Sequence, residues 1–343
     1  MALLAVALSG GVDSAVAAAR MMELGHQLIG VHLILAGNVS PDAQRVAEKL
    51  EIPFEVWDFS KDFRSQVCDY FVDEYGQGRT PNPCLRCNQK IKFGQLLDRV
   101  LESGYEGLIT GHYARLIRQT DLVELHRGLD LAKDQSYVLG VLSQSQLQKA
   151  WFPLGASTKE QVRQEAEARQ LPVANKSESM DICFIPDGDT TDWLKQQLGV
   201  KPGPILDSQG IEIGQHFGVH LYTIGQRRGL NLKIPAANGQ PRFVTSLDVS
   251  TNTVVVGERE QLAVAGLECI SANWCDESCS RDSFSAMVQV RAHSEAIPVE
   301  VTNHGQSFSL QLGQTIYGVA PGQQAVIYDK TKVVGSGTIS TSS

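Results

Sequence analysis

Residues 8–16 read LSGGVDSAV and lie between an apolar run at residues 3–8 and an Ala-rich segment with the pattern of a helix. Gly10 and Gly11 permit a tight turn whose backbone N–H groups are free to bind a ligand. Together with the positive end of the helix dipole, those groups favour a phosphate. The stretch is neither a Walker loop, which ends in Gly-Lys-Ser/Thr, nor a G-x-G-x-x-G fingerprint. It predicts a phosphate-binding turn; the alternative is an ordinary capped helix after a tight turn.

The composition is that of a soluble globular protein with several domains. The chain has 343 residues, of which 42% are hydrophobic, enough for two or three domains. No window is apolar over the length of a membrane helix, and the apolar start lacks the features of a secretory signal, so we expect a cytoplasmic protein without a membrane partner. With a net charge of −8, an RNA partner would need a local basic surface.

Hydrophobic periodicity predicts a doubly wound α/β fold in the first half of the chain. Short apolar runs alternate with helical patterns, as in repeated βαβ units on a parallel sheet. The runs cover residues 3–8, 28–35, 53–57 and 107–110, and the helical patterns cover residues 14–24, 41–51, 62–75 and 88–103. A capping box formed by Ser157 and Glu160 predicts a further helix. A phosphate turn after the first strand then lies at the edge where such folds bind ligands.

Beyond Gly203 the pattern changes to short Val-, Ile- and Thr-rich runs punctuated by Gly and Pro, which are typical of strands. We therefore expect an α/β domain at residues 1–200, followed by two smaller β-rich domains at residues 201–265 and 266–343.

Two stretches without Asp or Glu predict surfaces for a polyanion in this acidic chain. Residues 76–94 carry Arg79, Arg86, Lys90 and Lys92, and residues 213–247 carry Arg227, Arg228, Lys233 and Arg242. The alternative for each stretch is a solvated face that is basic by chance.

Three of the seven cysteines are candidates for chemistry. Cys84 and Cys87 form a C-x-x-C motif in the first basic stretch, and Cys183 lies in SMDICFIPDGD. A thiolate beside these cations and near a helix start at Asn88 should have a lowered pKa, which suits sulfur or metal chemistry. An unremarkable pair of thiols is the alternative. We expect no function for Cys68, Cys269, Cys275 and Cys279.

Seven motifs in order along the chain resemble the tRNA-specific 2-thiouridylase (MnmA) family of the PP-loop ATP pyrophosphatases. They are SGGVDS at 9–14, TPNPCLRCNQKIKFG at 80–94, TGHYAR at 110–115, KDQSYVL at 133–139, DICFI at 181–185, YTIGQRRGL at 222–230 and APGQ at 320–323. The resemblance implies a PP-loop domain, a small central domain and a C-terminal β-barrel. It also implies a reaction in which ATP adenylates the C2 oxygen of the wobble uridine (position 34) in tRNA and a cysteine persulfide delivers sulfur, giving 2-thiouridine, AMP and pyrophosphate.

The resemblance also implies roles for individual residues. Cys87 would be the nucleophile and Cys183 the persulfide carrier; Cys87 would either free the terminal sulfur or form a transient disulfide with Cys183. Independently of the resemblance, the residue types of the phosphate turn suggest that Asp13, with Ser14, would help to hold Mg²⁺ and phosphate. ATP would contact Ala7, Leu8, Ser9, Gly10, Gly11, Val12, Asp13, Ser14, Leu33 and Gly111. The tRNA, of the Lys, Glu or Gln type, would contact Asn82, Pro83, Cys84, His112, Lys133, Asp134, Gln135, Arg291, Ala292 and Gln323. A persulfide donor protein would supply the sulfur.

Departures from the family pattern leave alternatives open. Cys84 stands where many members carry Asp, so Cys84, Cys87 and Cys183 are also possible ligands of an iron–sulfur cluster, which we do not favour. Ala292 replaces a common Tyr, and the segment at residues 36–44 is shorter than in many relatives. Rival functions are another PP-loop enzyme, such as an amidating or lysidine synthetase, and a non-catalytic RNA-binding or iron–sulfur module.

Overall fold

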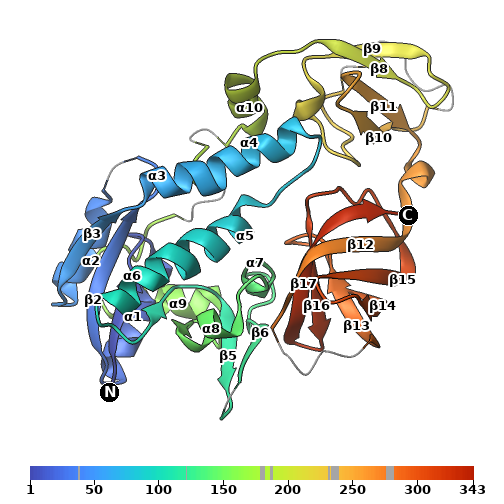
Figure 1. The fold of residues 1–343 in the computed structure, drawn as a ribbon. Coiled ribbons are helices and arrows are strands. Elements are labelled where there is room, and N and C mark those ends of the chain that lie inside the picture. The colour runs from blue at the N-terminus through green and yellow to red at the C-terminus, as the bar shows by residue number, and fades with distance from the viewer. Residues whose placement is uncertain are drawn as a thin grey trace.

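Three β-sheets organise the protein (Figure 1). The computed structural model describes residues 1–37, 39–120, 122–177, 182–185, 188–230, 232, 239–275 and 282–343. No helix in these ranges is both long enough and apolar enough to cross a membrane.

The first sheet is parallel and has the strand order β3-β2-β1-β4-β7. Its strands are β1 (Leu3–Ala7), β2 (Gln27–Ile34), β3 (Phe54–Asp58), β4 (Leu108–Ile109) and β7 (Ala150–Trp151). Side chains alternate along β1, so that Leu4 and Val6 belong to one hydrophobic core and Ala5 to another. The sheet therefore buries both faces.

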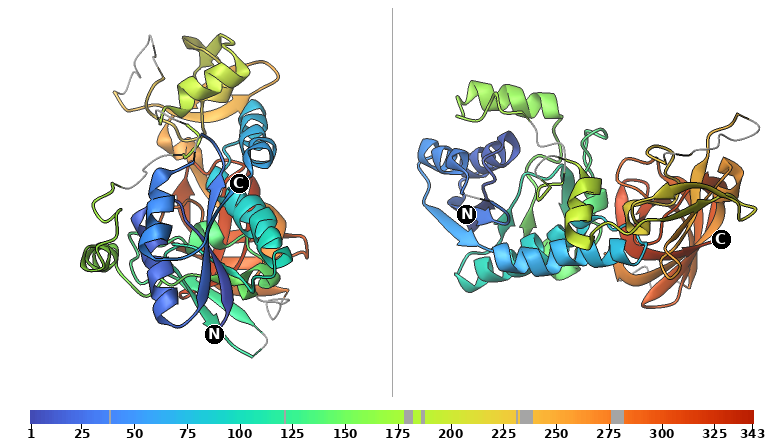
Figure 2. Two further views of the ribbon diagram at one scale, coloured as in Figure 1. Left: turned by 90° about the vertical axis from the view of Figure 1, so that its left-hand side faces the viewer. Right: turned by 90° about the horizontal axis from the view of Figure 1, so that it is seen from above.

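Helices cover both faces of this sheet, as Figure 2 shows. One face packs against α1 (Val12–Glu23), α2 (Pro41–Lys49) and α9 (Lys159–Ala168). The other packs against two long helical segments: α3 (Ser60–Phe63), η1 (Arg64–Cys68) and α4 (Asp69–Gly76), then α5 (Pro83–Cys87), η2 (Asn88–Leu96) and α6 (Leu97–Glu102). The predicted doubly wound α/β fold is confirmed.

Two predicted helix starts are wrong. The helix expected to begin at Asn88 begins at Pro83, because the Asn82 side chain accepts hydrogen bonds from the N–H groups of Cys84 and Leu85. The capping box of α9 is formed by Thr158 and Gln161, whereas the neighbouring Ser157 hydroxyl accepts a hydrogen bond from Arg20. The remaining helices are α7 (Ser136–Leu139), α8 (Gln144–Gln148), α10 (Thr190–Leu198), η3 (Val219–Leu221) and η4 (Arg259–Leu262).

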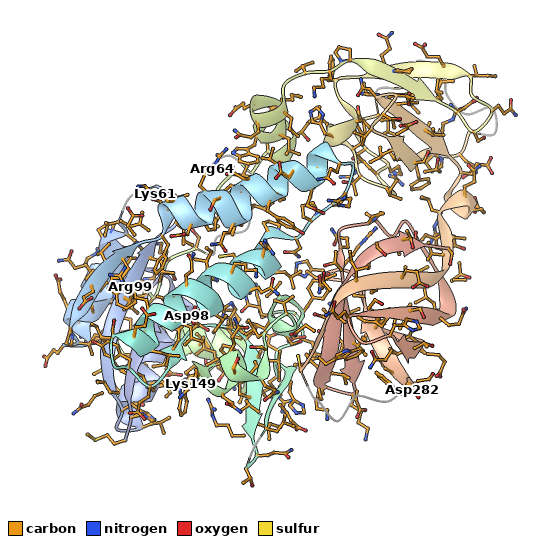
Figure 3. All side chains as sticks on the ribbon, viewed as in Figure 1. Lys61, Arg64, Asp98, Arg99, Lys149 and Asp282 are labelled. Carbon is orange, nitrogen blue, oxygen red and sulfur yellow. The ribbon has the colours of Figure 1, made fainter. Side chains whose placement is uncertain are left out.

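The α10 helix, which follows the Cys183 segment, is held against the α3–η1–α4 segment. Arg64, labelled in Figure 3, donates to Asp69 at 2.8 Å and to Gln197 of α10 at 2.9 Å. The Phe71 ring on α4 packs on Trp193 of α10 with centroids 5.9 Å apart. The chain on the C-terminal side of Cys183 is therefore anchored.

The second sheet has the order β10-β11-β8-β9 and a small core of its own around Ile205, Val244 and Val254. Its strands are β8 (Gly203–Leu206), β9 (Glu212–His216), β10 (Phe243–Asp248) and β11 (Thr253–Gly257).

The third sheet closes into the predicted C-terminal β-barrel, because β12 pairs with both β15 and β17. The barrel strands are β12 (Ala263–Trp274), β13 (Ser283–Gln289), β14 (Ile297–Asn303), β15 (Ser307–Tyr317), β16 (Gln324–Asp329) and β17 (Lys332–Ser342), in the order β12-β15-β14-β13-β16-β17.

A hairpin from the first half of the chain extends the barrel sheet. It consists of β5 (Ala114–Arg118) and β6 (Val123–Arg127), and β6 pairs with β17. The N–H of Arg127 donates to the carbonyl of Thr331 at 2.8 Å. Nearby, the Tyr137 hydroxyl on α7 donates to the carbonyl of Gln324 at 2.9 Å, so the barrel is docked on the α/β part through buried polar contacts. The sequence patterns did not predict this hairpin.

Candidate functional site

A cavity of about 380 Å³ lies at the carboxyl ends of β1, β2 and β4, where a parallel sheet of this type binds ligands. It brings together six parts of the chain: the predicted phosphate turn, the end of β2, Lys92 in η2, the loop after β4, Gln135 in the KDQ segment, and the Cys183 segment. Its lining residues are Ala7, Leu8, Ser9, Asp13, Ser14, His32, Leu33, Leu35, Ala36, Lys92, Thr110, Gly111, His112, Gln135 and Cys183.

The phosphate turn leaves backbone groups available at the start of α1. Gly11 is the N-cap residue, and no side chain caps the helix. Ser14 Oγ instead turns back, accepting from the Ser9 N–H at 3.2 Å and donating to the Gly11 carbonyl at 3.1 Å. The uncapped N–H groups suit a phosphate. Gly10, Gly11 and Val12, which we predicted to contact ATP, do not line the cavity.

Two glycines allow close packing around this turn. Gly10 has a φ of +74°, and a Cβ there would lie 2.4 Å from Ser40 Oγ at the start of α2. A Cβ on Gly111 would lie 2.8 Å from the carbonyl carbon of Asp13 and 2.9 Å from the Ser14 nitrogen. The loop after β4 therefore lies directly against the first turn of α1.

Asp13 lies in the cavity wall but already has partners. Its carboxylate accepts from Lys159 Nζ at 2.7 and 2.9 Å and from the Tyr113 hydroxyl at 2.8 Å. Sequence reasoning missed Lys159 and Tyr113. Tyr113 lies within the TGHYAR motif, whereas Lys159 is a single lysine in an ordinary helical pattern and carried no signal.

The end of β2 supplies an apolar wall with one fixed imidazole. Leu33, Leu35 and Ala36 line the cavity beside His32, another residue that sequence reasoning missed. His32 Nε2 accepts from the Ser40 N–H at 3.1 Å, so that its Nδ1–H donates to the Leu8 carbonyl at 2.8 Å. This wall suits the flat base of a nucleotide.

His112 is a neutral, buried part of the wall. Its Nδ1 lies 2.7 Å from Thr110 Oγ1, and its ring packs between Phe93 and Phe152. Burial holds the pKa of His112 well below its usual value. Its predicted contact with tRNA stays a prediction.

The three candidate thiols lie within electrostatic range of one another. Cys87 is buried, whereas Cys84 and Cys183 are exposed as residues although protein atoms surround most of each sulfur. The expectation of lowered thiol pKa values is wrong. Burial raises the pKa of all three, that of Cys87 to about 11. The fourth nearby thiol, Cys68, is also buried, and its pKa rises to about 11.

The positions of the basic residues at 76–94 explain why the thiol pKa values are raised and not lowered. Arg86 points away from the thiols, since it donates to the Gln66 carbonyl at 3.1 Å and stacks on the Tyr70 ring. Arg79 pairs with Glu74. Among the basic residues of this stretch, only Lys92 has a positive charge that lowers the pKa of all three thiols, and burial raises these pKa values by more.

An aromatic cluster anchors Cys183 through the next residue. The Phe184 ring is buried, with its centroid 5.2 Å from that of Trp193, 5.6 Å from Phe71 and 5.7 Å from Phe63. This anchor presents the exposed Cys183 to the cavity. Of the DICFI motif, only Asp181 lies outside the described residues.

The segment KDQ at 133–135 is held largely by contacts within the chain. The Asp134 carboxylate accepts from Arg127, the Gly128 N–H, and the N–H and hydroxyl of Ser136. Gln135 lines the cavity, and its side chain accepts from the Tyr113 N–H at 2.9 Å. Lys133 is half-buried. The structure thus shows an internal role for Asp134.

The predicted contacts from the barrel also have partners within the chain. Gln323 Nε2 donates to the Thr80 carbonyl at 2.6 Å, and the Thr80 N–H donates to the Pro321 carbonyl at 2.8 Å. Arg291 donates to the Gly318 carbonyl, and Ala292 packs partly buried at the edge of a core. The barrel therefore holds, through hydrogen bonds to Thr80, the loop that leads to Asn82 and the C-x-x-C helix.

No group of three or more His, Cys, Asp or Glu side chains is arranged to hold a metal ion among the described residues. Cys84, Cys87 and Cys183 do not form such a group in this conformation, and Cys279 lies outside the described ranges.

Comparison with known proteins covers nearly the whole chain. Family models match residues 2–187 (tRNA methyl transferase HUP domain), 191–258 (tRNA methyl transferase PRC-barrel domain) and 264–339 (Aminomethyltransferase beta-barrel domain). A solved 4-thiouridine synthetase–RNA complex with bound ATP is 16% identical, with a TM-score of 0.39 over 57% of this chain and 50% of that one, a likeness too low to bear on function.

Curated relatives are much more similar. The tRNA-specific 2-thiouridylase MnmA of Acidothermus cellulolyticus is 50% identical over 97% of this chain and 96% of its own length. That of Cutibacterium acnes is 49% identical over 97% and 95%, respectively. With identity of this level over nearly the full length of both chains, the chain belongs to the tRNA-specific 2-thiouridylase (MnmA) family.

Proposed function

We propose that this protein is an ATP-dependent tRNA-uridine 2-sulfurtransferase that replaces the C2 oxygen of the wobble uridine by sulfur. The observation that carries the proposal is that the phosphate turn and Cys183 line one and the same cavity. A carbonyl oxygen is a poor leaving group, so the replacement needs an activating group and a soft nucleophile at one place. The names of the curated relatives support the same reaction.

The first step activates the uridine. The phosphates of ATP would lie over the first turn of α1, with adenine beside Leu33. The uridine C2 oxygen attacks the α-phosphorus, and pyrophosphate leaves with the bonding electron pair. Asp13 is the only carboxylate among the described lining residues; to hold an Mg²⁺ ion with Ser14 and the phosphates, it would have to exchange its pair with Lys159 for the ion. Such an ion would neutralise phosphate charge during this step.

The second step transfers sulfur. The terminal sulfur of a Cys183 persulfide attacks C2, the C2–O bond breaks, and AMP leaves with the electron pair. The Cys87 thiolate then attacks Cys183 Sγ, which forms a Cys87–Cys183 disulfide and leaves one sulfur on C2. A thiol reductant restores both cysteines, and a sulfur donor protein reloads Cys183. We favour this route over an iron–sulfur cluster on Cys84, Cys87 and Cys183.

The test follows both half-reactions. Purified protein is incubated with unmodified tRNA of the Lys, Glu or Gln type, ATP and a persulfide donor; AMP, pyrophosphate and 2-thiouridine are then measured, the last by mass analysis of nucleosides. Asp13→Asn should abolish all three products. Cys183→Ser should still release pyrophosphate while forming no 2-thiouridine. Production of ADP and phosphate, or tRNA binding without consumption of ATP, would overturn the proposal.

A further inference from the structure

Lys92 projects into the same cavity from the helical segment that carries Cys87. It lies in η2, where the neighbouring Ile91 and Phe93 are 0% and 1% exposed. Burial of these two neighbours fixes the backbone around Lys92. Its half-buried side chain lines the cavity together with Ser14 and Cys183. The lysine thus shares one cavity with the phosphate turn and the persulfide position.

Lys92 has no counter-ion within the described ranges. The one carboxylate among the described lining residues, Asp13, is already paired with Lys159. Of the other basic residues at 76–94, Arg79, Arg86 and Lys90 line a different groove, between α5 and the barrel. Among the described residues, the cavity therefore holds a cation that no protein carboxylate neutralises, so that its charge is available to a thiolate or a substrate.

The thiols respond to this charge. Lys92 lowers the pKa of Cys84, Cys87 and Cys183, against a larger rise caused by burial. The other titratable groups that face the cavity are His112, which burial keeps neutral, His32, and Asp13 in its pair with Lys159.

We propose that Lys92 is the cation that stabilises the sulfur anion of Cys183 for its attack on the activated uridine, an inference that rests on the proposed function. Before the attack, negative charge resides on the sulfur; afterwards it resides on the departing AMP. An ammonium group that lines the same cavity as both positions stabilises the charge along this path. The S–C2 bond forms and the C2–O bond breaks, while Lys92 keeps its protons.

The experiment compares Lys92→Met and Lys92→Arg with Lys61→Met. Lys61 is exposed on α3 (labelled in Figure 3), so its removal changes the net charge equally without touching the cavity. The first measurement is the rate of Cys183 alkylation by iodoacetamide against pH, read by peptide mass analysis. Lys92→Met should shift the profile to higher pH, so that alkylation of Cys183 at pH 8 is severalfold slower. Lys92→Arg should largely restore it, and Lys61→Met should match the unaltered protein.

The second measurement separates the two half-reactions. In Lys92→Met, formation of 2-thiouridine should fall at least tenfold, with tRNA-dependent pyrophosphate release within about twofold of normal. An unchanged alkylation profile would refute the role of Lys92, as would an equal loss in both half-reactions, which would assign the lysine to ATP. Absence of 2-thiouridine with the unaltered protein would instead refute the proposed function. The two failures can be told apart, because the alkylation profile is measured without tRNA or ATP and so does not depend on that function.

Discussion

Replacement of Gly111 by Ala tests how closely the phosphate turn and the β4 loop must fit. The added Cβ would lie 2.8 Å from the carbonyl carbon of Asp13, 2.9 Å from Asp13 Cβ and 2.9 Å from the Ser14 nitrogen. Two of these three atoms belong to the backbone of the first turn of α1, so they cannot rotate away as a flexible side chain would. Either the loop or the start of the helix must move.

The size of the movement sets the expected effect. Ordinary carbon contacts begin at about 3.4 Å, so a 2.8 Å approach requires a shift of about 0.6 Å. Overpacking of this kind costs about 1–3 kcal/mol of stability. A displacement approaching 1 Å in a catalytic group costs about 10²-fold in rate. We therefore expect Gly111→Ala to lower tRNA-dependent pyrophosphate release about 10- to 100-fold.

The assay measures pyrophosphate release at saturating ATP, with urea unfolding as the measure of stability. Gly76→Ala, at the end of α4, is the matched control, because its Cβ would meet only Leu198 Cδ2 at 3.8 Å. This control should keep full activity and lose no stability. Wild-type pyrophosphate release and stability in Gly111→Ala would refute the close fit on which the argument depends.

Three further predictions concern the thiols and the basic surface. Phe184→Ala removes the ring that packs against Trp193 and holds Cys183 at the cavity. Formation of 2-thiouridine should therefore fall at least tenfold while pyrophosphate release stays normal. An equal loss in both would contradict a role of Phe184 in positioning Cys183 alone. Because burial raises the pKa of Cys87 to about 11, its thiolate fraction and its alkylation rate should rise about tenfold per pH unit between pH 7 and 10, and a plateau near pH 8 would contradict this. Arg227 and Arg228 are exposed, and replacing both by Ala should weaken binding evenly across substrate tRNAs and reduce the salt slope by about one to two; an unchanged slope would assign them another role.

The sequence was informative where function depends on short local patterns. The LSGGVDSAV stretch predicted a strand, a tight turn and a helix start, and the structure contains all three. Alternation of apolar runs with helical patterns predicted the parallel sheet because each βαβ unit is local in the chain. The β-rich character beyond Gly203 was equally local.

Features that depend on distant partners were not predictable in this way. Lys159 lies 146 residues from Asp13, and nothing in its helical surroundings marks it as a partner of the phosphate turn. The prediction of lowered thiol pKa values was wrong for a related reason. Nearness in sequence placed Arg86 beside Cys87, whereas the fold directs Arg86 towards Tyr70 and surrounds Cys87 with apolar side chains.

The β5–β6 hairpin also constrains the order in which the chain can fold during synthesis. Its partner strand β17 begins at Lys332, so 205 residues separate the end of β6 at Arg127 from the edge that it pairs with. At about 5–20 residues per second, the ribosome needs roughly 10–40 s to supply that edge. During this interval β6 offers an unpaired edge to other nascent chains. A chaperone that shields residues 123–127 until the barrel emerges would therefore raise the yield of native protein.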